Sequence, residues 1–366
     1  MKLLAPFLLS ILTAQVTIAQ QSIEQIFLMQ QVPKIYQVNK ITNTAIQIDG
    51  LNHEDVWKNT PWTDSFVDIE GIQKPKPLYD TKVKMLWDDQ YLYIYAKLEE
   101  PHIWGDIKDH DAIIYHNNDF ELFFKPYENQ STYFEIEVNT LNTILDLLMN
   151  KPYRFGGEAM LQWDAKGLKS AIHIEGTNND PNDEDKYWAI EMAIPFKAIN
   201  NFGRKPTPTV GDYWRMNFSR VQWQHEVING QYTRKKENDR LLAEDNWVWS
   251  PIGLIDMHYP ERWGFIQFID SINKHTSSLP KSYPIERFTW NIYYLQNIYK
   301  QKNNRYSSLQ SVLDPKSSIL KDSDQFSTEI TLNQDSTFFI AKIKDLKNNI
   351  TTSVDCNGNY TINYDK

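Results

Sequence analysis

Two segments constrain the fold of this chain most: Asn118 to Phe124, with the sequence NDFELFF, and Tyr133 to Asn139, with the sequence YFEIEVN. Both have the composition of β-strands, and in a strand only alternate residues share a face. The segments therefore predict two successive strands that place acidic side chains and a tyrosine on one surface. The residues expected there are Tyr115, Asp119, Glu121, Glu135 and Glu137.

Strand patterns extend over most of residues 41–269. Apolar and polar residues alternate from Tyr91 to Leu98, and Asp88-Asp89 supplies the turn of a predicted hairpin with Lys82 to Trp87. Further strands are predicted at 144–149, 168–175, 187–194, 214–223 and 264–269, with a short helix at 196–201. We therefore expect a mainly β protein whose residues 41–270 form an antiparallel β-sandwich of the jelly-roll or immunoglobulin-like type.

The pattern changes after residue 270. Residues 271–284 are polar and predict a linker, and apolar residues at helical spacing then predict a helix from Ile285 to Leu313. Part of this helix weakly resembles the head domain of pilins. Four strands are expected at 326–332, 337–343, 350–354 and 360–364, with Asn357-Gly358 as a type I′ turn. Residues 285–366 are thus predicted to be a small α+β domain.

The N-terminal residues predict export. Lys2 precedes an apolar run from Leu3 to Leu12, and the segment closes with small residues up to Ala19. The run is too short and too interrupted to span a bilayer. We expect residues 1–19 to be a signal peptide, residues 20–40 to be a lead-in, and the mature protein to reside in the periplasm or outside the cell.

Charge and cysteine content exclude some classes. Without residues 1–19, whose only charged side chain is Lys2, the chain has 37 basic and 47 acidic residues, a net charge of −10. This balance disfavours nucleic acid as a partner. Cys356 is the only cysteine, so no intrachain disulfide can form and stability must come from packing.

Carboxylates beside a large aromatic ring are typical of saccharide sites. The ring covers the apolar face of a pyranose, while the oxygens accept hydrogen bonds from its hydroxyl groups. A structural reading stays open, because acids on half-buried strands usually face solvent. Arg215 and Arg220 could also pair with these acids, which would make the whole cluster structural.

Residues 41–269 resemble the family 9 carbohydrate-binding modules of secreted bacterial proteins in seven places. These are Ile48-Asp49-Gly50 with Trp57, Trp87-Asp88 leading into Tyr91 to Tyr95, Asn118 to Phe124, Phe134 to Asn139, Trp188 to Pro195, Gly211 to Arg220, and Asp245 to Gly264. The resemblance implies a β-sandwich that binds saccharides. It also implies attachment to polysaccharide-degrading enzymes and stabilisation by bound calcium.

The resemblance also implies binding residues. Sugar-binding members have an aromatic six residues before an acid, which corresponds to Tyr115 and Glu121. Glu137 stands where those members have an arginine, and a carboxylate accepts hydrogen bonds where arginine donates them, which puts the pocket in doubt. Trp249 is the expected second aromatic, and His258 its polar neighbour.

The segment from Asp106 to Asp119 is the densest group of potential metal ligands. Its oxygen donors suit calcium, and the expected ligands are Asp106, Asp109, Asp111 and Asp119. Zinc is less favoured, because His110 and His116 lie six residues apart without a second ligand pair. Haem would require ligands such as Met216 and His258.

The sequence favours a secreted, non-catalytic protein that binds an oligosaccharide or polysaccharide and is linked to polysaccharide breakdown. Residues 285–366 would dock to an envelope protein. No catalytic residue is predicted, because no motif singles out a pair of carboxylates and no nucleophile elbow occurs. Two alternatives stay open: a polysaccharide-degrading hydrolase that uses Glu121, Glu135 and Glu137, and an envelope scaffold whose sugar pocket has been lost.

Overall fold

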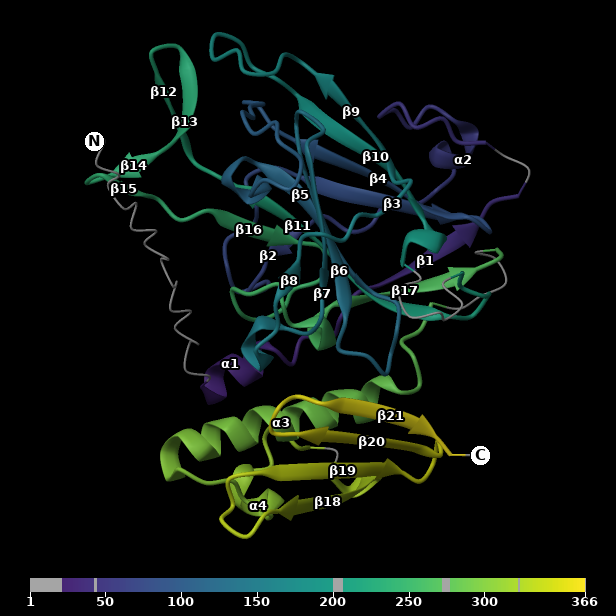
Figure 1. Ribbon diagram of the computed structural model, residues 1–366, viewed down its shortest axis with the longest axis vertical. Helices are drawn as coiled ribbons and strands as arrows, with labels where there is room; N and C mark the ends of the chain where they lie inside the picture. The colour runs from purple at the N-terminus through teal and green to yellow at the C-terminus, as the bar shows by residue number, and fades with distance from the viewer. Residues whose placement is uncertain (1–21, 43–44, 200–206, 272–276, 322, 366) are drawn as a thin grey trace, which may run out of the picture.

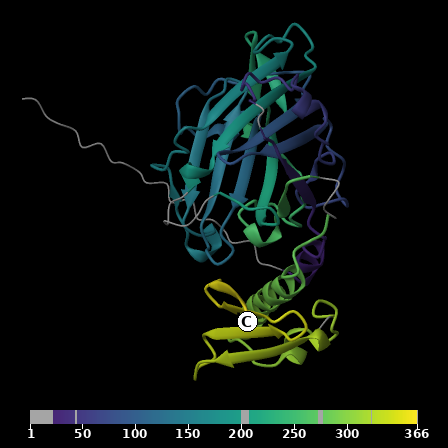
Figure 2. The same ribbon diagram turned by 90° about the vertical axis from the view of Figure 1, so that its right-hand side faces the viewer.

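The computed structural model describes residues 22–42, 45–199, 207–271, 277–321 and 323–365. A large β-sheet region lies above a smaller unit of one long helix and a four-stranded sheet, both in Figure 1 and in the view turned by 90° in Figure 2. The mainly β class predicted from the sequence is confirmed. The predicted signal peptide, residues 1–19, lies outside the described residues.

One mixed sheet of thirteen strands forms the larger region. Its main path runs β8-β7-β6-β5-β11-β17-β1-β3-β4-β10-β9, and β16 pairs with β11 and with β2. The bounds are β1 (Ile35–Lys40), β2 (Val67–Asp68), β3 (Thr81–Trp87), β4 (Tyr91–Glu99), β5 (Asp119–Lys125), β6 (Tyr133–Asn139), β7 (Ile144–Met149), β8 (Ala159–Met160), β9 (Lys169–Glu175), β10 (Tyr187–Pro195), β11 (Tyr213–Gln222), β16 (Asp245–Val248) and β17 (Gly264–Ile269). Every strand predicted between residues 82 and 269 is present, with ends within one residue of the prediction.

The sheet is not antiparallel throughout, so that part of the prediction is wrong. β1 runs parallel to both of its neighbours, with Val38 opposite Phe268 of β17 and Asn39 opposite Leu86 of β3. Residues 20–40, which were predicted to be a lead-in, therefore contribute a strand to the middle of the sheet. The hydrogen-bonded pairing also forms one continuous sheet, where the sequence predicted the two sheets of a sandwich.

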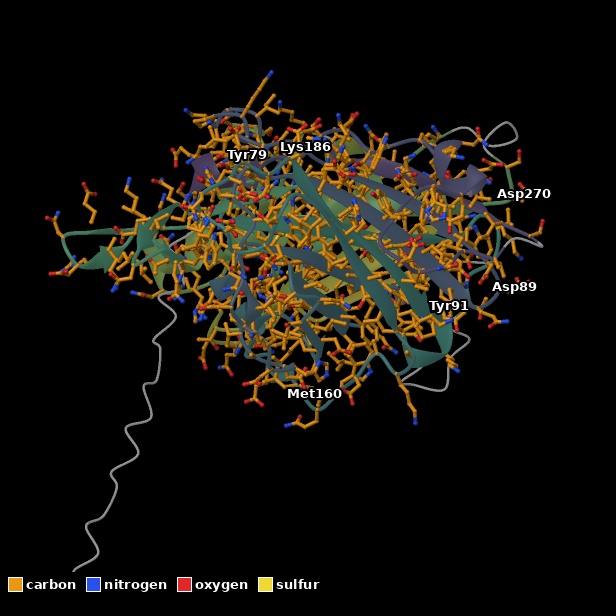
Figure 3. The ribbon with its side chains drawn as sticks, turned by 90° about the horizontal axis from the view of Figure 1, so that it is seen from above. Tyr79, Asp89, Tyr91, Met160, Lys186 and Asp270 are labelled. Carbon is orange, nitrogen blue, oxygen red and sulfur yellow. The ribbon has the colours of Figure 1, made fainter. Side chains whose placement is uncertain are left out.

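The sheet curls around a shared hydrophobic core. Phe120 and Leu122 of β5 belong to the same buried cluster as Ile190 and Met192 of β10, although these strands lie in different halves of the sheet. Seen from above, Asp89 and Tyr91 at the turn between β3 and β4 lie toward one side of the molecule, the side on which Asp270 also lies (Figure 3). The alternate residues of β5 point away from this core, which leaves a second face for polar groups.

Short helices and hairpins cover the ends of the large sheet. The helical segments are α1 (Ile23–Leu28), α2 (Asp55–Lys58), η1 (Ile114–His116), η2 (Tyr153–Phe155), η3 (Phe196–Ile199) and η4 (Pro260–Arg262). The hairpins are β12 (His225–Ile228) with β13 (Gln231–Arg234), and β14 (Lys236–Glu237) with β15 (Arg240–Leu241). The predicted helix at 196–201 begins as η3, and its last two residues lie outside the described part. Within the described residues, no helix is both long and apolar enough to cross a membrane.

The C-terminal unit packs helix α3 (Tyr283–Asn303) on a sheet of order β18-β19-β20-β21. The remaining bounds are α4 (Gln310–Leu313), η6 (Ser323–Gln325), β18 (Phe326–Leu332), β19 (Phe339–Asp345), β20 (Ile350–Asp355) and β21 (Tyr360–Tyr364). The predicted single helix is divided, because Asn304 adopts the left-handed conformation (φ 56°) and ends α3. The loop from β20 to β21 has only Gly358 at positive φ, so the predicted type I′ turn, which needs two such residues, is absent.

Helix α3 also packs on the large region. Ile292 of α3 and Phe123 of β5 belong to one hydrophobic cluster. Glu261 of η4 lies at this junction, where its carboxylate accepts two hydrogen bonds from Arg154 (2.7 and 2.9 Å) and one from the hydroxyl group of Tyr294. The strands that carry the acidic side chains are therefore supported from below by the C-terminal unit.

Candidate functional site

Strands β5 and β6 bring four carboxyl groups together on one face. They pair antiparallel, with Glu121 opposite Glu137 and Phe123 opposite Glu135. Because alternate residues share a face, Asp119, Glu121, Glu135 and Glu137 all lie on the side of the sheet opposite the core of Phe120 and Leu122. We call these four residues the acidic row. The predicted clustering of these acids on one face is confirmed.

The acidic row is buried, and no basic side chain among the described residues pairs with it. Its four side chains are at most 6% exposed, and oxygens of Asp119, Glu121 and Glu137 lie within 4.8 Å of one another. In the part of the chain that the structure describes, no lysine, arginine or histidine forms an ion pair with any of the four. The two arginines considered from the sequence pair elsewhere, Arg215 with Glu286 (2.7 Å) and Arg220 with Glu100 (3.1 Å).

Burial without a counter-charge favours the protonated form of these acids. Burial, and then the charge of Glu137, raises the pKa of Glu121 to about 8, and burial raises the pKa of Glu137 to about 7. Burial and the neighbouring carboxylates raise the pKa of Asp119 and of Glu135 well above their ordinary values. A protonated carboxyl group can donate as well as accept. The sequence comparison with arginine assumed that Glu137 can only accept hydrogen bonds. Near neutral pH this restriction does not hold, because the protonated form of Glu137 can also donate one.

Tyr115 is held beside the acidic row by its backbone. It lies on η1, whose Ile114 is buried, and its own side chain is 40% exposed. Its N–H donates to Oε2 of Glu137 (3.2 Å), and its carbonyl accepts from Nε1 of Trp223 (2.7 Å). The aromatic ring is thus accessible while its attachment point is fixed.

Tyr153 is a second exposed aromatic near the acidic row, and the sequence reasoning missed it. Its side chain is 44% exposed, and its ring meets the His258 ring edge-on at 4.5 Å. Burial, and then the charges of Glu135 and Glu137, raises the pKa of Tyr153 to about 12, which reflects its proximity to both acids. Tyr153 begins the short helix η2, which Gly156 ends with a positive φ of 72°, so no strand periodicity could reveal where its ring points.

A family model described as carbohydrate family 9 binding domain-like matches residues 48–218. These residues are similar to that domain, and we call the sheet region that contains them the family 9-like domain. The acidic row and both exposed tyrosines lie within it. No curated protein matches the chain.

Solved structures similar to this chain include three from two organisms. A candidate carbohydrate-binding protein from Bacteroides uniformis is 17% identical, with a TM-score of 0.46 over 65% of this chain and all of that chain. A family 9 carbohydrate-binding module from Caldicellulosiruptor kristjanssonii in complex with cellotriose is 17% identical, with a TM-score of 0.39 over 68% of this chain and all of the module. Its complex with glucose is 16% identical, with a TM-score of 0.38 over the same shares.

Trp249 does not lie where the sequence comparison placed it, whereas His258 lies beside the Tyr153 ring. Trp249 is 1% exposed and packs on Phe218 in the core, on the opposite side of the sheet from Glu121, so it cannot offer a ring face to a ligand. His258 is partly buried, and its Nδ1 is hydrogen-bonded to the Tyr133 hydroxyl group at 2.7 Å. Burial, and then the charge of Arg154, lowers the pKa of His258 to about 4, which keeps it neutral.

The predicted calcium ligands do not converge. In the described residues, neither Asp106 nor Asp109 belongs to a group of three close ligand atoms. Asp106 accepts a hydrogen bond from Asn117 (2.8 Å), while Asp119 belongs to the acidic row and Asp111 lies near His110. The set of four therefore does not fit one calcium ion.

The haem ligands considered from the sequence are also separated. Met216 points into the core inside the curled sheet, whereas His258 contacts Phe123 on the outer face. His116 packs its ring against Tyr115 (4.7 Å between centroids) and is not in a metal-ligand group among the described residues.

Proposed function

We propose that the family 9-like domain binds a saccharide on the outer face of β5 and β6, without catalysing a reaction. The observation that carries this proposal is the exposed ring of Tyr115, fixed by backbone hydrogen bonds next to buried, un-neutralised carboxyl groups. An aromatic ring binds the apolar face of a sugar, and adjacent carboxyl groups bind its hydroxyl groups. The family match supports the same class of ligand.

The protonation of the acidic row suits neutral sugars. A hydroxyl group both donates and accepts, and a set of carboxyl groups that is partly protonated near neutral pH offers both partners. Asp119 Oδ2 and Glu135 Oε2 are buried and have no hydrogen-bond partner among the described residues, which leaves acceptor capacity unused beside Glu121 and Glu137. Tyr153 supplies a second exposed aromatic, on which the charges of Glu135 and Glu137 both act.

The spacing of the acids disfavours hydrolysis. The two carboxyl groups of a glycosidase stand on either side of the scissile bond, about 5 to 9.5 Å apart. Here oxygens of Asp119, Glu121 and Glu137 lie within 4.8 Å of one another on a single buried face. Binding without cleavage is therefore the better supported function.

Several finer features belong to this proposal. The mature protein would act outside the cytoplasm, in the periplasm or beyond, as the predicted signal peptide implies. Its saccharide would be an oligosaccharide or polysaccharide fragment produced by a separate enzyme. The C-terminal unit would serve for docking to an envelope protein.

A glycan array on the mature protein, followed by titration calorimetry with glucose and cellotriose as first ligands, tests the proposal. Tyr115→Ala should weaken binding by about 1 to 3 kcal/mol, or roughly 5- to 150-fold, because the ring's apolar contact is lost. Tyr364→Ala is the matched control, since this tyrosine is also exposed (57%) but lies on β21. Failure to bind any saccharide would overturn the proposal and favour a scaffold with a lost pocket. Cleavage of a bound glycan would favour the hydrolase.

A further inference from the structure

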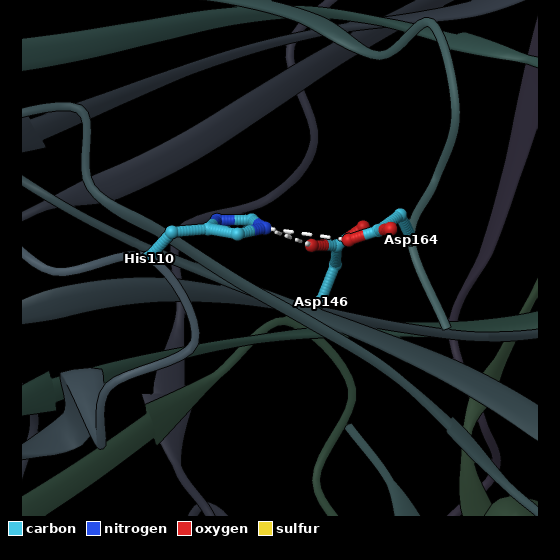
Figure 4. A group of neighbouring side chains, drawn as sticks. All are labelled: His110, Asp146 and Asp164. Carbon is cyan, nitrogen blue, oxygen red and sulfur yellow. Dashed lines mark hydrogen bonds and ion pairs between the residues drawn. The ribbon is translucent and has the colours of Figure 1, made fainter. Parts of the chain in front are cut away.

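A second cluster of ligand-type side chains lies apart from the acidic row. His110 belongs to the loop between β4 and η1, Asp146 to β7, and Asp164 to the loop between β8 and β9. Figure 4 shows the His110 ring pointing at the two carboxylates. Nε2 of His110 lies 3.4 Å from Asp164 Oδ1, 3.6 Å from Asp146 Oδ1 and 3.5 Å from Asp111 Oδ1.

This cluster is on the other face of the sheet from the proposed saccharide site. In the pairing of β6 with β7, Glu137 is opposite Leu145 and Ile136 is opposite Asp146. Neighbouring positions on a strand point to opposite faces, so Asp146 points away from Glu137. The two sites therefore lie on adjacent strands but on opposite faces of the sheet.

The buried member of the cluster has one carboxylate oxygen without a hydrogen-bond partner among the described residues. Asp146 is 3% exposed, and its Oδ2 accepts a hydrogen bond from the backbone N–H of Ala165. Its Oδ1, which faces His110, has no hydrogen-bond partner among the described residues. A buried carboxylate oxygen without a donor is costly, and a cation is one way to satisfy it.

The separations fit ligands around one ion better than direct hydrogen bonds. His110 Nε2 is hydrogen-bonded to Asp164 Oδ1, but at 3.4 Å this bond is longer than the usual about 2.7 to 3.2 Å, and the other two distances from Nε2 are longer still. Two ligands at about 2.0 to 2.2 Å from a tetrahedral zinc ion lie about 3.3 to 3.6 Å apart, which is the range of these distances. A mixed set of one imidazole and carboxylates also suits zinc better than calcium, which takes six to eight oxygens.

We propose that His110, Asp146 and Asp164 bind a zinc ion, with Asp111 as a further ligand. The ion joins the loop that carries His110 to β7 and to the segment after β8, and it neutralises part of the local negative charge. Asp111 already donates its backbone N–H to the carbonyl of Ile144 (3.0 Å), which holds this loop against β7. The His110 and Asp164 side chains are 56% and 67% exposed, which gives the ion a route from solvent.

Zinc analysis of the full mature chain tests the proposal. After dialysis with zinc chloride, elemental analysis should find one ion per chain, and titration calorimetry should give a dissociation constant in the micromolar range or below. Cobalt(II) in the same site should give the visible absorption of tetrahedral coordination. Manganese and calcium chlorides are the competing probes and should not displace zinc at equal concentration.

Variants identify the ligands. His110→Ala and Asp164→Asn should each weaken zinc binding at least tenfold, and both changes are at exposed side chains, so the fold should persist. His53→Ala is the control, because this histidine is exposed on another loop. Asp146→Asn is a third variant, whose folding is checked first by circular dichroism. Zinc binding that His110→Ala leaves unchanged, or binding no stronger than that of a protein lacking the site, would overturn the proposal.

Discussion

Replacing Glu121 by glutamine tests the electrostatic cost of the acidic row. Burial and the charge of Glu137 raise the pKa of Glu121 from 4.5 to about 8 in the folded protein. Between these values the folded state holds a proton that the unfolded state has lost, so the free energy of unfolding falls as pH rises. The contribution is fully present below about pH 4.5 and is lost by about pH 8. One such group changes stability by about 1.4 kcal/mol per pH unit, so the whole range is up to about 5 kcal/mol.

Glutamine has nearly the same shape as glutamate and no charge to bury. We expect Glu121→Gln to be more stable than the wild type at pH 8 by about 2 to 5 kcal/mol, with the difference vanishing towards pH 4.5. Urea unfolding, followed by tryptophan fluorescence between pH 4.5 and 8.5, measures how the free energy of unfolding depends on pH in the wild type and in the variant. Glu329→Gln, on the exposed face of β18, is the control and should change stability by less than about 0.5 kcal/mol at every pH. A Glu121→Gln variant with the wild-type slope and no added stability at pH 8 would refute the reasoning.

Three further substitutions test how other buried groups hold the fold. Arg220→Met should lower the free energy of unfolding by about 3 to 5 kcal/mol, because Glu100 loses a buried charge partner at 3.1 Å. Urea unfolding measures this change, and a loss below about 1 kcal/mol would contradict the prediction. Gly358→Ala should lower the midpoint temperature of thermal unfolding. The φ of +75° is strained for alanine, and the new Cβ would lie 2.2 Å from Cζ of Phe155. An unchanged midpoint in calorimetry would argue against this packing. Glu191→Ala should lower the free energy of unfolding by about 2 to 4 kcal/mol. Two backbone N–H groups and one indole N–H, at 2.8 to 3.1 Å from the carboxylate, would lose their acceptor. Chemical denaturation that finds no loss would show that water replaces the carboxylate.

The strands could be predicted because their signal is local. In β4 aliphatic residues alternate with tyrosines and Lys97. Asp88 supports the hairpin turn by accepting hydrogen bonds from the N–H groups of Gln90 and Tyr91, both at 2.7 Å. β1 could not be recognised in this way. Only Tyr36 and Val38 of its six residues are buried, and its partner strand β17 lies some 230 residues further along the chain. A parallel pairing over such a distance leaves no local pattern.

In the candidate site too, residues on neighbouring strands could be placed from the sequence, whereas residues whose position depends on distant pairing could not. Glu121 and Glu137 could be placed together because their strands are consecutive and pair directly. Trp249 could not be oriented, because the face it occupies depends on the register of β16 against β11, where Val248 lies opposite Ser219. A shift of one residue moves every side chain of a strand to the other face. Tyr153 depends on the path of a loop, which periodicity does not describe.

The position of β1 and β17 bears on how this protein can be divided for experiments. The family match spans residues 48–218, yet β17 and β1 lie between β11 and β3 in the order of the sheet and both fall outside that span. A fragment cut at the family boundaries would lose two adjacent central strands and leave β11 and β3 with open edges, which invite aggregation. The unit defined by sequence similarity is therefore smaller than the unit that folds. Expression of this domain alone requires ends chosen before Ile35 and after Ile269.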